Sequence, residues 1–246
     1  MRRFLASLAA ALFCLAQAAQ AQLIVTELAG FGASGETPLP VLSFLQCASS
    51  DANATSYTYS AQNVGTASAS RATIVGIAAR DSATLFTVST VTVGGDSATS
   101  VKDDGGAQQI SSALFIVANP AGTSEDVVVT FSEAVTSASI CLWAVTDLSS
   151  LTAVATANAS NGTGAALTLD VNTQAYGVIA GMCGVFTSGG TVAPTGSAIE
   201  RADADTAEIH YAAYDYTEGA SGASPRSFGC DNSLSNSTSG VSASFR

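Results

Sequence analysis

Hydrophobic and polar residues alternate along most of this chain, in short runs that end at turn residues. In the run DVVVTFS, Val127, Val129 and Phe131 fall on one face of an extended strand, and the other face is mostly polar. The run ALTLDV repeats this pattern, with Leu167 and Leu169 on one face. A period of two indicates strands with one packed and one solvated face, which is typical of antiparallel sheets.

The whole pattern predicts an all-β fold, because no later window shows the spacing of an amphipathic helix. Turn residues separate the runs, as at Gly94–Gly95 and Asn161–Gly162. About a dozen short strands at this spacing predict one antiparallel β-sandwich or jelly-roll-like domain. The expected strands are residues 23–29, 41–45, 56–60, 73–79, 85–93, 112–118, 127–131, 139–146, 166–171, 176–186, 197–201, 208–214 and 241–245.

One run departs from the alternation because both of its faces are apolar. In SICLWAVT, Ile140 and Leu142 face one way, and Cys141 and Trp143 face the other. We therefore expect a central strand that is covered on both sides. Residues 176–186 are also largely apolar and predict a second strand of this kind.

The N-terminus has the features of a secretory signal peptide. Arg2 and Arg3 precede an apolar run at residues 4–16, and small residues follow, which predicts cleavage after Ala21. The alternative is an uncleaved anchor, but the apolar run is shorter than the ~20 residues that a membrane span needs. We expect an exported protein with no membrane span after cleavage, located outside the cell, at its surface or in a periplasm.

No linker divides the chain that remains after cleavage. We therefore expect residues 22–246 to form a single domain. Residues 218–240 are rich in Ser, Gly and Asn and predict a long loop within it. No internal repeat is clear enough to indicate a propeller or a solenoid.

Charge limits the partners that this chain is expected to bind. It has 8 basic and 19 acidic residues, a net charge of −11, and only 11% of its residues are charged. Removal of Arg2 and Arg3 makes the balance more acidic. An acidic surface repels phosphate backbones, so we expect no nucleic-acid partner.

Four cysteines remain after signal cleavage, namely Cys47, Cys141, Cys183 and Cys230. An even number in an exported chain predicts two disulfides, with three possible connectivities; free buried thiols are the alternative. Because Cys141 and Cys183 lie on the two apolar strands, we expect them to pair, which leaves Cys47–Cys230. No C-x-x-C pair occurs and His210 is the only histidine, so a zinc site is not expected.

Catalytic groups are not apparent in the sequence. Alternation places His210 on the solvent face of a strand, without the partners of a hydrolytic triad, and no G-x-S-x-G motif occurs. Glycoside hydrolysis needs two carboxylates at a defined separation, which spacing along a sandwich does not reveal. We expect a protein that is not an enzyme.

Acidic turns are weak calcium candidates, and no other metal or cofactor is expected. Calcium needs six to eight oxygen ligands, and the best acidic turns contain Asp103 and Asp104, or Asp203 and Asp205. Neither turn matches the twelve-residue loop of a helix–loop–helix calcium site. Solvated turns, in which aspartate side chains bond the local backbone, are the alternative.

Five tyrosines are candidates for a sugar-stacking platform. Strand alternation places Tyr57 and Tyr59 on one face, and Tyr214 and Tyr216 on one face, with Tyr211 nearby. Aromatic residues on a strand face also serve as cross-strand packing, which is the alternative interpretation.

Several segments resemble a family of uncharacterised β-sandwich domains found in tailed-phage structural proteins and in bacterial prophage-like or surface proteins. The similarity covers roughly residues 44–216 and is carried by strand and turn patterns, above all ALFIVANPAGTSEDVVVTFSEAVTSASICLWAVT and AYGVIAGMCGVF. The resemblance implies a non-enzymatic virion or surface module and no catalytic residues. The signal peptide, Cys141 and Cys183 depart from the family pattern and favour an exported bacterial protein.

These expectations together describe an exported, non-enzymatic structural or interaction module that presents loops or a sheet face to a protein or a surface glycan. The alternative is a carbohydrate-binding domain that uses the tyrosines. A glycan hydrolase on the same scaffold is the third reading.

Overall fold

The structure is a computed structural model. It describes residues 38–246 apart from 82, 84, 106–108, 119–120, 163, 165, 187–190, 222–224 and 234–235. The predicted signal peptide, residues 1–21, and the predicted strand at residues 23–29 lie outside the described residues. Residues Leu39–Arg246 form one compact unit.

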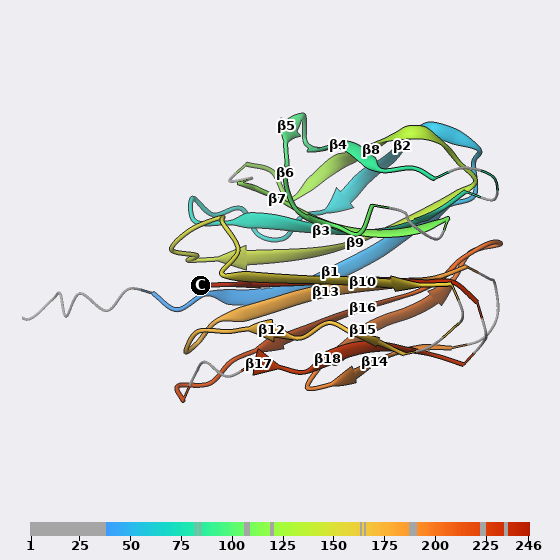
Figure 1. Cartoon of the computed structure of the whole chain (residues 1–246). Coiled ribbons are helices and arrows are strands. Elements are labelled where there is room, and N and C mark those ends of the chain that lie inside the picture. The colour runs from blue at the N-terminus through green and yellow to red at the C-terminus, as the bar shows by residue number, and fades with distance from the viewer. Residues whose placement is uncertain are drawn as a thin grey trace, which may run out of the picture. The chain divides into compact units, whose positions relative to one another are not determined.

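The described residues form nineteen strands, and every paired strand is antiparallel to its neighbour (Figure 1). The all-β, antiparallel prediction is therefore confirmed. The strands are β1 (Val41–Ser50), β2 (Ala54–Asn63), β3 (Ala72–Arg80), β4 (Val88–Val93), β5 (Asp96–Ser97), β6 (Thr99–Asp103), β7 (Ile110–Ala118), β8 (Ser124–Val135), β9 (Ser137–Thr146), β10 (Ala155–Asn161), β11 (Leu167–Thr168), β12 (Val171–Asn172), β13 (Val178–Val185), β14 (Val192–Gly196), β15 (Ile199–Asp205), β16 (His210–Thr217), β17 (Pro225–Arg226), β18 (Phe228–Asn232) and β19 (Thr238–Phe245).

These strands build two sandwiches. In the N-terminal half, β1–β9 form an inner sheet of order β1-β9-β3-β7-β6 and an outer sheet of order β2-β8-β4-β5. In the C-terminal half, β10–β19 form an inner sheet of order β10-β19-β13-β16-β15, with outer strands β11-β18-β14 and β12-β17. One apolar core lies between the two sheets of each half, and a third lies between the two inner sheets.

The two halves have the same topology. The strands of the first half, apart from β5, have counterparts in the second, and replacing the one set by the other converts the strand order of the first inner sheet into that of the second. The counterparts of β1, β2, β3, β4, β6, β7, β8 and β9 are, in turn, β10, β11, β13, β14, β15, β16, β18 and β19. The same replacement converts β2-β8-β4 into β11-β18-β14. The compact unit is therefore a tandem of two equivalent sandwiches, and the expectation of one sandwich with about a dozen strands is too simple.

Several strands escaped prediction because their sequences are polar and built from small residues. The run ATANASN of β10 and the run TSVKD of β6 carry little of the apolar alternation that identifies a strand. Both are edge strands of their inner sheets, so their positions depend on neighbours that sequence alone does not reveal. The long loop predicted at residues 218–240 is also wrong in part, because β17, β18 and the start of β19 lie within it.

The prediction of a covered central strand at Cys141 and Trp143 is confirmed. This strand is β9, which pairs with β1 on one side and β3 on the other and is buried from Ser137 to Val145. Ile140 and Leu142 contribute to the N-terminal core, whereas Cys141 and Trp143 face the other inner sheet. Burial of both faces favours apolar residues at successive positions, as the sequence has them from Ile140 to Val145.

A pair of facing residues in β13 and β16 offers a test of how tightly these sheets are packed. Gly181 lies directly opposite Tyr214, and a Cβ atom at position 181 would overlap the tyrosine ring. We expect Gly181→Ala to lower the free energy of unfolding by about 2 kcal/mol, because the buried ring has no room to move. Gly219→Ala is the matched control, since nothing lies within 4 Å of a Cβ atom there.

Urea unfolding of the two variants checks this expectation. Equal midpoints for Gly181→Ala and Gly219→Ala would contradict the packing described here.

Candidate functional site

The strands of both halves run between the same two ends, and these ends differ in chemistry. β9 finishes, and β10 starts, at the end where the chain enters β1, and Ser149 N donates a hydrogen bond to Arg246 O there at 2.9 Å. The described residues include seven large hydrophobic side chains that are exposed, and six of them lie at this end. We call it the apolar end, and its residues are Leu39, Val41, Leu151, Val154, Tyr176 and Ile199.

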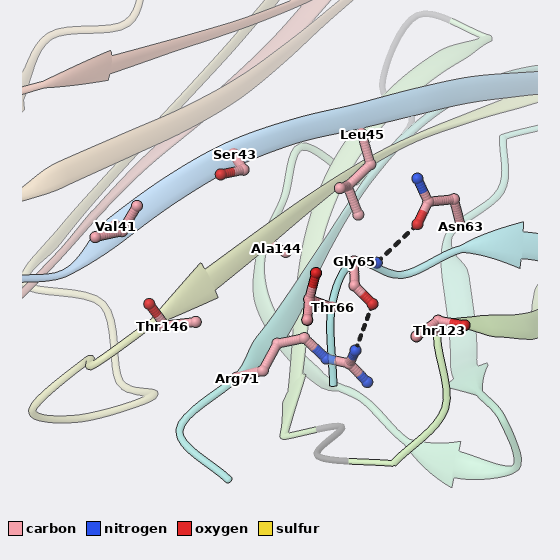
Figure 2. Close-up of a pocket in the computed structure, with 10 residues that line it drawn as sticks. All are labelled: Val41, Ser43, Leu45, Asn63, Gly65, Thr66, Arg71, Thr123, Ala144 and Thr146. Atoms are coloured by element: carbon pink, nitrogen blue, oxygen red, sulfur yellow. Dashed lines mark hydrogen bonds between the residues drawn. The ribbon is translucent and has the colours of Figure 1, made fainter. Parts of the chain in front are cut away.

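A cavity of about 400 Å³ opens at the apolar end of the N-terminal sandwich (Figure 2). It lies where the outer sheet leaves one corner of the inner sheet uncovered, next to Val41, which is 57% exposed. The floor is aliphatic and the rim carries hydroxyl and amide groups. The lining residues are Val41, Ser43 and Leu45 of β1, Ala144 and Thr146 of β9, Asn63, Gly65, Thr66 and Arg71 around the β2–β3 connection, and Thr123 before β8.

Arg71 holds one wall of this cavity in place (Figure 2). Its buried guanidinium donates to Gly65 O at 2.8 Å, to Gly122 O at 3.0 Å and to Ala121 O at 2.5 Å. These bonds tie the β2–β3 loop to the segment that precedes β8. Burial lowers the pKa of Arg71, and the nearby charge of Glu125 opposes this effect. The sequence analysis missed Arg71; its signal is a lone cation in a Ser-rich turn directly before a buried strand.

A second, smaller cavity of about 290 Å³ lies at the same end. It is bounded by β6 on one inner sheet and by the β9–β10 connection and β10 on the other. Leu151 and Ala153 line it opposite Val101 and Ile116. Two cavities and six exposed hydrophobic side chains thus share one end of the unit.

In the C-terminal half, an ion pair joins the connections that correspond to those joined by Arg71. Arg226 donates to both carboxylate oxygens of Glu218 at 2.6 Å, and Thr173 Oγ1 donates to Glu218 Oε2 at 2.9 Å. The hydrogen bond from Arg226 is the main cause that lowers the pKa of Glu218 to about 2, although burial opposes it. Glu218 therefore ties the β12–β13 loop to the end of β16, as Arg71 ties the equivalent loops of the first half.

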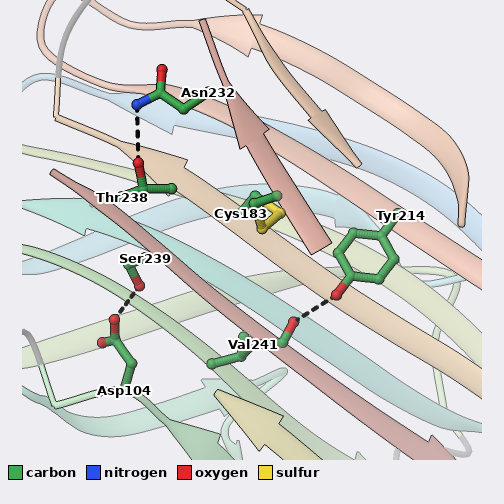
Figure 3. The surroundings of a disulfide bond; sticks show 8 residues. Asp104, Cys183, Tyr214, Asn232, Thr238, Ser239 and Val241 are labelled. Carbon is green, nitrogen blue, oxygen red and sulfur yellow. Dashed lines mark hydrogen bonds between the residues drawn. A yellow bond between two sulfur atoms is a disulfide. The ribbon is translucent and has the colours of Figure 1, made fainter. Parts of the chain in front are cut away.

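The four predicted cysteines all form disulfides, but the predicted pairing is wrong. Cys47 of β1 pairs with Cys141 of β9, and Cys183 of β13 pairs with Cys230 of β18 (Figure 3). β1 and β9 are neighbours, and their register places Cys47 directly opposite Cys141. Cys183 faces the outer strands, whereas Cys141 faces the other inner sheet, so the two side chains lie in different cores.

The disulfides also indicate where the protein works. Bonds of this kind persist in oxidising compartments, so the two disulfides indicate an oxidising, extracytoplasmic environment. They close 94 and 47 residues of chain, which in the chain-entropy model corresponds to roughly 5 and roughly 4 kcal/mol of stability.

The tyrosines do not form the exposed platform considered from the sequence. Tyr57 and Tyr59 are buried in the N-terminal core, Tyr211 between the inner sheets, and Tyr214 in the C-terminal core, while Tyr216 is partly buried. Their hydroxyl groups serve the fold: Tyr59 donates to Ala138 O at 2.8 Å and Tyr214 to Val241 O at 3.3 Å. The faces that alternation identified are therefore packed faces, because other sheets cover them.

The four aspartates weighed as calcium ligands have other partners. Asp103 accepts hydrogen bonds from Gly105 N at 2.8 Å and Val88 N at 3.3 Å, and Asp104 accepts from Ser111 Oγ at 2.8 Å and from Ser239 Oγ. Asp203 and Asp205 contact the ring of His210.

His210 itself is not the surface residue expected, because it is only 5% exposed. Within the described ranges, no group of three or more His, Cys, Asp or Glu side chains could hold a metal ion.

Comparison with known proteins assigns no family. No family model matches the chain, and no curated protein matches it either. A solved structure of Red Clover Necrotic Mosaic Virus aligns with 86% of this chain and 91% of its own, at 9% identity and a TM-score of 0.24. The N-terminal CBM22-1–CBM22-2 tandem domain of Xyn10C from Paenibacillus barcinonensis aligns with 86% of this chain and 99% of its own, at 9% identity and a TM-score of 0.22.

These weak matches to β-rich domains carry no argument about function. The resemblance to phage and bacterial surface modules therefore stays a prediction. In the part of the chain that the structure covers, no helix is long and apolar enough to cross a membrane.

Disulfide mapping tests the pairing directly. Cleavage at Asp147 or Asp170 separates Cys141 from Cys183. We expect mass spectrometry without reduction to recover Cys47 linked to Cys141, and Cys183 linked to Cys230. A peptide that joins Cys141 to Cys183 would contradict the structure.

The Glu218–Arg226 pair predicts a specific loss of stability in acid. The pKa of Glu218 is about 2 in the folded protein, below its ordinary value of 4.5. The pair therefore stabilises the fold above about pH 4.5 and loses this contribution as the pH falls towards 2. We expect Glu218→Gln to lower the free energy of unfolding by about 2 kcal/mol at neutral pH.

Chemical denaturation between pH 2 and pH 7 measures this effect. The difference between the wild type and Glu218→Gln should narrow as the pH falls, and Asp96→Asn, at an exposed carboxylate, serves as the control. A difference that stays constant over this range would contradict the assignment.

Proposed function

We propose that this protein is an exported, non-enzymatic interaction module that docks a partner protein on its apolar end. The observation that carries this proposal is the coincidence of two cavities and six exposed hydrophobic side chains at one end of the strands. Exposed apolar surface that is gathered in one place is typical of interaction sites, whereas single exposed hydrophobic residues are not.

The chemistry of the cavity beside Val41 favours an apolar side chain of a protein as its occupant. Val41, Leu45 and Ala144 offer aliphatic contact, and the hydroxyl groups of the rim can bond the backbone of a partner. Aromatic rings, on which sugars commonly stack, do not occur among its lining residues. A protein partner is therefore favoured over a surface glycan.

The walls of this site favour binding without rearrangement. Arg71 is bonded to carbonyl groups of two connections, so the cavity is held open by a buried, multiply bonded group. A site that is formed before the partner arrives loses little conformational entropy on binding. The residues that line it also supply no nucleophile with an adjacent base, which supports binding as its role rather than turnover.

Photo-cross-linking from two matched positions tests the proposal. Val41 lies at the apolar end and is 57% exposed. Among the described large hydrophobic residues that are exposed, Leu85 is the one that lies away from this end, and it is 61% exposed. A photo-reactive amino acid at position 41, in the cells that export this protein, should give a discrete adduct with one partner. The same residue at position 85 should not.

A second change links the adduct to the cavity. Thr146 lines the cavity beside Val41, so Thr146→Trp should fill it and reduce the adduct about tenfold, whereas Leu85→Glu should leave the adduct unchanged. Circular dichroism confirms that each variant is folded. Equal adducts from positions 41 and 85, or none from either, would overturn the proposal. Saturable glycan binding that Thr146→Trp abolishes would favour the carbohydrate-binding alternative instead.

A further inference from the structure

The only histidine of the chain lies between two carboxylates. His210 begins β16, opposite Asp205 of β15 on one side and Val185 of β13 on the other. Its Nδ1 lies 2.5 Å from Asp205 Oδ1, and its Nε2 contacts Asp203 Oδ1. The imidazole is 5% exposed, so water does not replace either contact.

The number of protons in this cluster follows from which of its atoms can donate a hydrogen bond and which can only accept one. An ionised carboxylate only accepts hydrogen bonds, and a neutral imidazole has one donor nitrogen and one acceptor nitrogen. A neutral His210 would therefore direct a lone pair at one of its two carboxylates. With both carboxylates ionised, both contacts are satisfied together only when both ring nitrogens carry protons.

We propose that His210 is held as an imidazolium ion whose two N–H groups latch the edge strand β15 onto β16, and that loss of one proton releases β15. This device is independent of the docking proposed for the apolar end. The latch is closed while His210 is protonated and both aspartates are ionised.

β15 depends on side-chain bonds more than the strands inside its sheet do. It is the last strand of the C-terminal inner sheet and pairs only with β16. Its side-chain bonds to β16 include the two aspartate contacts with His210 and an ion pair from Arg201 to Asp215 at 2.9 Å. One of the two contacts with His210 loses its hydrogen bond when the ring loses a proton.

The aspartates have a route out when the proton is lost. Their side chains are 33% exposed at Asp203 and 46% exposed at Asp205, although His210 is buried. Repulsion from a lone pair can therefore turn a carboxylate towards solvent, and β15 then loses one of its side-chain bonds to β16. Release would uncover the core contacts of Ala202 and Ala204 between the two inner sheets.

The remaining charged groups near this end of β16 are bonded to partners other than His210. Glu208 pairs with Arg80 at 3.2 Å, and Arg80 stacks on the ring of Phe186. Asp51 accepts from Ser137 Oγ at 2.7 Å and from Ala207 N at 3.0 Å. Burial raises the pKa of Asp51, but these hydrogen bonds outweigh it and hold the pKa below its ordinary value.

The neighbouring strands add no further titrating group to the cluster. β13 carries Cys183, which is in a disulfide, and the residues of β14 do not ionise. Asp203 and Asp205 are therefore the carboxylates that decide how many ring protons His210 needs.

Nuclear magnetic resonance can read the proton count, because the chain has one histidine. In protein labelled with ¹⁵N, we expect both ring nitrogens of His210 to show the shift of protonated nitrogen at pH 6, and one of them to change when the ring titrates. A single neutral tautomer at pH 6 would overturn the proposal.

Hydrogen exchange then tests the latch. Above the pH at which the ring signal changes, the protection factors of β15 should fall by up to about tenfold per pH unit. β10, at the other edge of the same sheet, is the internal control and should keep its protection factors. Parallel behaviour of β15 and β10 would overturn the latch.

Variants separate the latch from general stability. In Asp203→Asn and Asp205→Asn the amide can donate to a neutral imidazole, so β15 should lose its pH dependence and remain paired. Val41 lies in the other sandwich, so photo-cross-linking from position 41 fails or succeeds independently of these results. An unchanged pH dependence of β15 in both variants would contradict the assigned role of His210.

Discussion

The contact between the two inner sheets is the constraint on which the rest of this molecule depends. Each inner sheet packs against its own outer strands on one face and against the inner sheet of the other half on the other face. Separation of the halves would therefore expose an apolar face of each inner sheet. In the middle of this apolar contact Trp143 is fully buried, and its indole nitrogen donates to Asp215 at 3.2 Å. Arg201 bonds the same carboxylate, so one polar network fixes how the halves align.

The two halves share a topology but use different chemistry at equivalent places. A buried cation, Arg71, fastens the loops at one end of the first sandwich, and a buried carboxylate, Glu218, fastens them in the second. The disulfides differ as well, since one joins neighbouring strands of an inner sheet and the other joins an inner to an outer strand. The connections that line the open cavity of the first half correspond, in the second half, to connections joined by the Glu218–Arg226 pair.

The sequence predicts those parts of the fold that depend on local pattern. Short apolar runs between turn residues located β3, β7, β8 and β9, and an apolar run on both faces identified β9 as central. The duplication was not predictable, since it lies in the order of strands within sheets and not in a repeated residue pattern. His210 shows the same limit: alternation placed it on the solvent face of a strand, but it is 5% exposed and lies against Asp203 and Asp205.

The candidate site was the least predictable part. Exposed side chains such as Val41 and Leu151 have the same apolar character as core residues, and only the packing of the sheets shows that nothing covers them. The tyrosine prediction was wrong in the opposite way, because aromatic side chains that could have formed an exposed binding face are packed in the cores. Cysteine pairing depended on which strands are neighbours, and this information lies in the topology.

The position of the Cys47–Cys141 bond has a mechanical consequence. The chain enters the folded unit at Leu39 and runs directly into β1, an edge strand held to β9 by one row of backbone hydrogen bonds. A pulling force applied from the N-terminal side would break these backbone hydrogen bonds one after another, starting at Val41. The crosslink at Cys47 stops this process after the first residues of the strand, so a tether on that side transmits load to the core without unravelling it.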